Sequence, residues 1–169
     1  AINALFLYTN FLDKEYYGMV TFLLSASSIM MPLMAFGVHS TLIRFYSRYT
    51  DVAEREKFMT FMLFMPLLLI IPITLITYFF YDQIAFLILE KNPETKPFLW
   101  LIPIIGICMG YFEVYYAWVK VHMKSVIGNF ISEVLVRVVI MFMLFAVYWN
   151  WISEDQFIYG LAVAYFLQV

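Results

Sequence analysis

Charged side chains are scarce in this sequence. Asp, Glu, Lys and Arg make up 13% of its 169 residues, against about a quarter in soluble globular domains. Hydrophobic residues make up 64% of the chain, which excludes a disordered chain as well as an ordinary water-soluble domain. Ten Lys and Arg against twelve Asp and Glu form no basic surface, so we expect no nucleic-acid partner.

Residues that carry catalysis or bind metals are equally rare. Cys108 is the only cysteine and forms no internal disulfide. The two histidines, His39 and His122, stand far apart and lack metal-ligand spacing. The sequence contains no zinc-protease motif, no glycine-rich phosphate loop and no nucleophile elbow. We therefore expect no catalytic residue, no metal, no cofactor and no enzyme activity.

Long uncharged stretches dominate instead. Residues 16–43 and 58–81 hold no charge, 97–119 hold only Glu113, and 126–150 hold only Glu133 and Arg137. Each is longer than the about 20 apolar residues that cross a bilayer as a helix. The sequence predicts an all-α, polytopic transmembrane helix bundle in one membrane-embedded unit, and the missing initiator Met indicates an interior fragment. The expected spans are about 1–12 (partial), 16–46, 58–81, 97–119, 126–150 and 154–169 (partial).

Local signals refine these helices. Ser153 and Gln156 have the spacing of a capping box, so a helix is expected to begin there. Prolines inside the spans predict kinked helices, which are commoner in transporters than in rigid anchors. These prolines are Pro32, Pro66, Pro72 and Pro103.

Three charged residues within the spans are the first functional candidates, because each costs about 2.5–3.5 kcal/mol at the centre of a membrane helix. Glu133 and Arg137 have the i, i+4 spacing of one helix face, with Arg137 near the midplane. Glu113 falls at a matching depth on the neighbouring antiparallel helix. We expect one cluster of an Arg between two carboxylates, on a substrate or coupling-ion pathway. The structural alternative is an ion pair that only fixes packing.

Small and polar residues mark the helix faces expected to point inward. One face combines a Gly-x-x-x-Gly contact with the acid: Gly106, Gly110, Glu113 and Ala117. A second comprises Ser25, Ser28, Pro32, Ala35 and His39, and Asn129 joins the face of Glu133. These faces could line a hydrated cavity in which His39 relays protons. Alternatively, the serines bond their own backbone, the small residues permit close packing, and His39 is a satisfied interior histidine.

Arg44 and Arg48 share a helix face at one predicted membrane boundary. Their guanidinium groups are suited to hold an anionic head group or a pyrophosphate by charge-assisted hydrogen bonds. The alternative role is simple anchoring by positive charge.

Several short segments, in order along the chain, resemble bacterial polysaccharide flippases. The segments are FLDKEYYG at 11–18, FGVHSTLIRFY at 36–46, EVLVR at 133–137 and WIS at 151–153. These flippases belong to the superfamily that also contains multidrug and toxic-compound extrusion transporters and the lipid-linked peptidoglycan precursor flippases. The resemblance implies a bundle of a dozen or more helices in two lobes around a cationic cavity, with this chain forming most of the first lobe. Arg44 and Arg137 match positions where the family pattern carries Arg, whereas Glu113 and Glu133 depart from it.

The function implied by the resemblance is flipping of a polyprenyl-pyrophosphate-linked glycan across the inner (cytoplasmic) membrane by alternating access. The expected partners are the lipid bilayer, this glycan lipid and polysaccharide assembly proteins. The first alternative is an ion-coupled exporter of the multidrug type on the same scaffold. A membrane-embedded enzyme or a structural subunit is a further alternative.

Orientation follows from the loop charges. Loops 44–57 and 120–124 carry six Lys and Arg, and the loops of the alternate side carry three, so we predict that the first two lie in the cytoplasm. Single cysteines at Val52 and His122, in a Cys108→Ser background, should resist an impermeant thiol reagent added outside intact cells. Labelling of either cysteine from outside would contradict this orientation.

Overall fold

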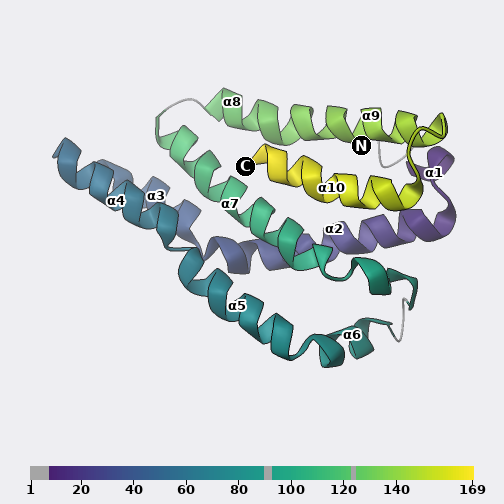
Figure 1. The fold of residues 1–169 in the computed structure, drawn as a ribbon. Coiled ribbons are helices and arrows are strands. Elements are labelled where there is room, and N and C mark those ends of the chain that lie inside the picture. Colours follow the sequence, from purple (N-terminus) through teal and green to yellow (C-terminus); the bar gives the residue numbers. More distant parts are fainter. Residues whose placement is uncertain (1–7, 90–92, 123–124) are drawn as a thin grey trace.

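The computed structural model describes residues 8–89, 93–122 and 125–169, and every regular element in them is helical. Figure 1 shows helices and no strands in these residues, which confirms the all-α prediction. The helices in chain order are α1 (Tyr8–Phe11), α2 (Lys14–Ala35), α3 (Val38–Phe45), η2 (Tyr46–Arg48), α4 (Val52–Phe64), α5 (Leu67–Phe79), α6 (Tyr81–Leu89), η3 (Pro93–Phe98), α7 (Leu101–Val121), α8 (Ser125–Phe130), η4 (Ile131–Leu135), α9 (Val136–Tyr148) and α10 (Glu154–Gln168).

Four helical segments are long and apolar enough to cross a membrane. They cover Lys14–Ala35, Val52–Phe79, Leu101–Val121 and Gly128–Tyr148, and correspond to the four complete spans expected from the sequence. Much of their surface is apolar, and α5 has no buried residue at all. An exposed apolar surface of this extent is suited to lipid rather than to water.

The span expected over 16–46 is interrupted in the structure. α2 ends at Ala35, and α3 begins at Val38 after Phe36 and Gly37 adopt left-handed φ angles of 50° and 63°. Gly37 adopts this conformation freely, whereas Phe36 does so at a steric cost. Pro32 lies one turn earlier and removes a helical hydrogen bond there. The expected single helix is therefore two helices with a bend between them.

The other prolines differ in their effect. Pro66 separates α4 from α5, and Pro72 lies inside α5. Pro103 lies in the first turn of α7, where N–H groups have no partner within the helix in any case. The kink expected at Pro103 therefore has no cause. α7 itself begins at Leu101 rather than near residue 97, because η3 precedes it.

The most extensive contact between two helices joins α2 to α7, and two glycines lie in it. A Cβ added at Gly106 would lie 3.1 Å from Met30 Cβ, and one added at Gly110 would lie 2.9 Å from Met34 Cβ. Ser27, fully buried between the two helices, donates a hydrogen bond from Oγ to the carbonyl of Ile102 at 3.1 Å. The predicted Gly-x-x-x-Gly face is therefore the contact surface of α7 on α2.

One end of the bundle ties α2 to α10 (Figure 1). The Glu154 carboxylate accepts a hydrogen bond from the Asp13 backbone N–H at 2.9 Å, and the Tyr16 hydroxyl donates one to Asp155 at 3.0 Å. The capping box of Ser153 and Gln156 is present, as the sequence predicts. The acids thus lie at the N-termini of two helices, where the helix dipoles favour negative charge.

The two ends of the bundle differ in charge. Loops 44–57 and 120–124 carry six Lys and Arg against three acids, whereas loops 13–15, 82–96 and 149–155 carry three Lys against seven acids. Tyr46 and His122 lie with ring centroids 5.8 Å apart, which brings the two basic segments together at one end. We call this the basic end and the opposite one the acidic end.

Gly110→Ala should destabilise the fold by about 1–3 kcal/mol, because the new methyl group overpacks the contact with α2. Gly18→Ala is the matched control, since nothing lies within 4 Å of a Cβ added there and both changes gain the same helix propensity. The measurement is the apparent Tm of the two variants in detergent. Equal Tm values would show that the glycine contact does not set stability.

Candidate functional site

An ion pair stands in the fourth spanning segment. Arg137 Nη2 lies 2.5 Å from Glu133 Oε2, at the i, i+4 spacing that the sequence predicts. The pair is not enclosed: the exposed fractions of the two side chains are 55% for Arg137 and 63% for Glu133. A charged pair on the outer surface of an apolar helix needs water or protein beside it, because lipid solvates it poorly.

The helix is irregular where this pair lies. Residues Ile131–Leu135 form a π-helical turn, in which the N–H of Val136 bonds the carbonyl of Ile131, five residues earlier. π turns are rare and frequently found at functional sites, because they change which side chains share a helix face. Here the turn contains Glu133 and ends two residues before Arg137. The positive charge of Arg137 also acts on Tyr165 of α10.

Glu113 does not join this pair. The Glu113 side chain is half-buried on α7, and its carboxylate has neither an ion pair nor a hydrogen bond within the described segments. At 100° per residue, Glu113 falls between Gly110, which faces α2, and Tyr116, which meets α8. The predicted three-residue cluster is therefore a pair and a separate carboxylate. Arg137 pairs with Glu133 in the same spanning segment, so this ion pair needs no residue from a neighbouring helix.

Asn129, which the sequence places on the face of Glu133, accepts a hydrogen bond from α7. The Tyr116 hydroxyl of α7 donates a hydrogen bond to its side-chain oxygen, and the Lys120 ammonium lies 3.9 Å from the centre of the Tyr116 ring. This group joins the end of α7 to α8 across the short connection between them. Asn129 is exposed one turn before Glu133.

The polar face predicted on α2 and α3 is only partly buried. Ser25, Ser28 and Pro32 are exposed, Ala35 is buried, and His39 is half-buried. Ser28 donates a hydrogen bond to the carbonyl of Ser25 at 2.8 Å. This serine therefore bonds the backbone of its own helix, as the structural alternative expected. His39 lies 3.2 Å from the Ser40 hydroxyl through Nε2. No group of three potential metal ligands occurs in the described part of the chain.

Three arginines gather at the basic end, each against an aromatic ring. The Arg48 guanidinium carbon lies 4.6 Å from the Phe45 ring centre, that of Arg44 lies 6.0 Å from the same ring, and that of Arg55 lies 5.1 Å from the Tyr46 ring. None of these arginines is paired with a carboxylate among the described residues. Stacking occupies the face of a guanidinium and leaves its N–H edge available to an anion.

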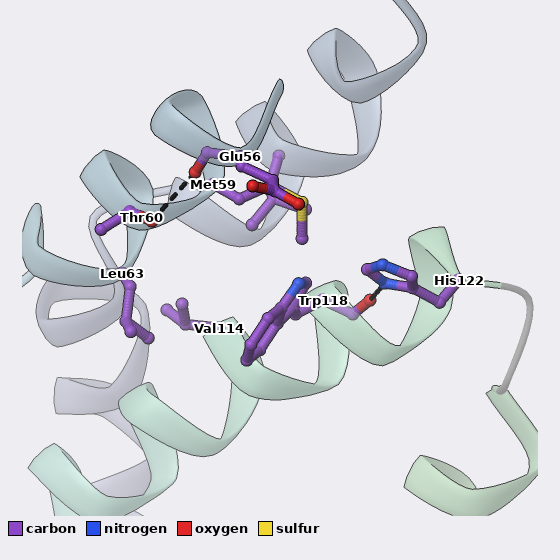
Figure 2. A pocket seen from close by; sticks show the side chains of 8 residues that line it. Glu56, Met59, Thr60, Leu63, Val114, Trp118 and His122 are labelled. Carbon is purple, nitrogen blue, oxygen red and sulfur yellow. Dashed lines mark hydrogen bonds between the residues drawn. The ribbon is translucent and has the colours of Figure 1, made fainter. Parts of the chain in front are cut away.

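A cavity of about 300 Å³ lies between α3, α4 and α7, and it is lined in part by His122, which contacts Tyr46. Figure 2 shows Trp118 and His122 projecting from α7 toward Glu56 and Met59 of α4. His122 Nδ1 lies 2.8 Å from the carbonyl of Trp118. Sequence reasoning missed this cavity, although the i, i+4 spacing of Trp118 and His122 places both on one face of α7.

The comparisons with known proteins add no assignment. No family model, no curated protein and no solved structure matches this chain. The likeness to polysaccharide flippases therefore stays a prediction from short motifs.

If the face of the ion pair is hydrated, cysteines beside it should react with a charged, impermeant thiol reagent. Val134 and Val138 are exposed neighbours of the pair, and Ile71 on α5 is an exposed apolar control. In a Cys108→Ser background we expect Val134→Cys and Val138→Cys to label at least about tenfold faster than Ile71→Cys, because lipid excludes the charged reagent. Equally slow labelling at all three positions would place the pair against lipid or buried protein.

Proposed function

We propose that this chain belongs to a transporter that flips a lipid-linked oligosaccharide with a pyrophosphate head across the cytoplasmic membrane by alternating access. The observation that carries the proposal is the exposed Glu133–Arg137 pair on a π turn within a membrane-crossing helix. At about 2.5–3.5 kcal/mol per charge at the helix centre, the pair is costly to keep against lipid. A water-filled path through the bundle removes that cost.

The basic end supports an anionic substrate. Arg44, Arg48 and Arg55 are exposed or half-buried, stacked on rings and unpaired with carboxylates among the described residues. A pyrophosphate offers several oxygen acceptors to such N–H edges, and guanidinium groups bind them in pairs. The head group would meet these arginines first, before it enters the hydrated path.

The helix breaks support movement rather than rigid anchoring. α2 gives way to α3 at Phe36 and Gly37. A turn at Met65 and Pro66 lies between α4 and α5, and a π turn lies in the fourth crossing segment, while both of these segments stay helical throughout. Discontinuous membrane helices are typical of transporters, in which unwound backbone lines the substrate path and helix segments rock against each other. The proposed reaction breaks no covalent bond, so it requires no catalytic nucleophile.

One observation favours the alternative of an ion-coupled exporter on the same scaffold. The Glu113 carboxylate is half-buried and has no partner among the described residues. An unpaired acid in a membrane helix is suited to bind a proton or a sodium ion. Glu113 can equally serve ion coupling in a flippase. The two functions are therefore distinguished by the substrate that the protein transports.

The test is a flipping assay with the purified full-length protein in proteoliposomes and a fluorescent polyprenyl-pyrophosphate glycan. Arg44→Lys keeps the charge but loses the paired N–H edge, and we expect a fall of about tenfold in flipping rate, a change of about 1.4 kcal/mol. Lys57→Gln removes a positive charge from the same end and is the matched control, with little expected loss.

Full flipping by Arg44→Lys and Arg44→Gln would contradict the role of Arg44 in head-group binding and reduce this arginine to an anchor, while leaving the flipping function itself in place. A different result would contradict the function. Absence of any flipping by the wild-type protein, together with export of a small cationic dye driven by an ion gradient, would favour the exporter instead.

A further inference from the structure

A long apolar groove lies apart from the ion pair and the basic end. It has a volume of about 890 Å³ and runs between α2, α5, α6 and α7. Its walls are formed mainly by aliphatic side chains, among them Met30, Ile84, Ala85, Ile88, Ile102 and Ile107. All four helices contribute to it, so the groove is a feature of the packed bundle rather than of one helix.

Polar side chains gather at one end of this groove. Tyr78 lies in the last turn of α5, Tyr81 and Asp82 begin α6, and Trp100 directly precedes α7. These residues lie toward the acidic end of the bundle. Tyr and Trp are enriched at the level of lipid head groups, so we expect this end of the groove at a membrane surface and its apolar length within the hydrocarbon.

Asp82 is the one charged residue among those that line the groove. Its side chain is exposed and has no ion-pair or hydrogen-bond partner in the described ranges. The loops of the acidic end carry seven acids against three Lys. A negative field of this kind repels anionic head groups and attracts an ammonium group.

The surroundings of the groove are also apolar and exposed. Ile29 is 73% exposed, Phe79 is 72% exposed and Phe86 is 71% exposed. At this depth in a bilayer the abundant apolar ligands are acyl chains, and a groove open to the membrane exchanges chains with it laterally.

We propose that the groove binds a zwitterionic phospholipid with a primary ammonium head group, with its acyl chain along α2 and α6 and its ammonium group at Asp82. The site is separate from the proposed transport path, and binding there does not require that the protein transport anything. A bound lipid of this kind would hold α5 and α6 against α2 and α7.

The test compares lipids retained by the purified protein. Membranes of equal phosphatidylethanolamine and phosphatidylglycerol content are extracted gently, and lipids bound to the protein are counted by native mass spectrometry. We expect the wild type to retain phosphatidylethanolamine over phosphatidylglycerol by about two- to fivefold, the range that one exposed charge pair supplies. Asp82→Asn should bring this ratio close to one, whereas Asp51→Asn, an acid at the basic end, should leave it unchanged.

Filling the groove is the second arm of the test. Ala85 is buried on α6 and lines the groove, so Ala85→Trp should abolish the retention of both lipids. If that variant fails to fold, Ala26→Leu narrows the same groove from α2 and should reduce retention. An unchanged lipid ratio in Asp82→Asn, or unchanged retention in the groove-filling variants, would overturn the proposal, as would a mass equal to two chains without lipid.

Discussion

The arrangement of the described helices depends on the close approach of α2 and α7. Gly110 leaves no room for a side chain, Gly106 leaves little, and Ser27 closes the contact with a hydrogen bond to the carbonyl of Ile102. In a bilayer the hydrophobic effect does not drive helices together, so contacts of this kind supply the association energy. Besides α2, α7 contacts α3, α8 and α10. Both the cavity at the basic end and the apolar groove are spaces between α7 and its neighbours.

The second constraint is the placement of charge. Most charged residues lie at the two ends of the bundle, where water and lipid head groups solvate them, and only Glu113, Glu133 and Arg137 interrupt the apolar stretches 16–43, 58–81, 97–119 and 126–150. Glu133 and Arg137 neutralise each other but remain exposed, and Glu113 has no ion-pair or hydrogen-bond partner among the residues that the structure describes. The charges that are costly in lipid are thus the ones with a claim to function. The unequal charge of the two ends gives each a different ligand preference, anionic at the arginines and cationic at Asp82.

Features set by local chemistry were predictable from the sequence. The capping box at Ser153, the i, i+4 pair of Glu133 and Arg137 and the contact face of Gly106 and Gly110 each depend on spacing within one helix. Features that depend on how helices meet were not predictable. Ser27 is buried whereas Ser25 and Ser28 are exposed, and Glu113 stays apart from Arg137. Periodicity predicts which residues share a helix face, but it does not predict which helix packs against that face. Pro32 and Gly37 indicated a bend near residue 36, but the left-handed φ of Phe36 and the π turn at Glu133 had no clear signal, since both conformations oppose local preference.

The contact between α2 and α7 can be measured directly by cross-linking. In a Cys108→Ser background, Met30→Cys and Gly106→Cys place two thiols on Cβ positions 3.1 Å apart, and a shift of a few tenths of an ångström gives disulfide geometry. The account predicts rapid and nearly complete disulfide formation in native membranes under mild oxidation, and none between Met30→Cys and a cysteine at Gly18. Absence of the cross-link, with both thiols reactive toward a small permeant reagent, would contradict the packing on which both proposed sites depend.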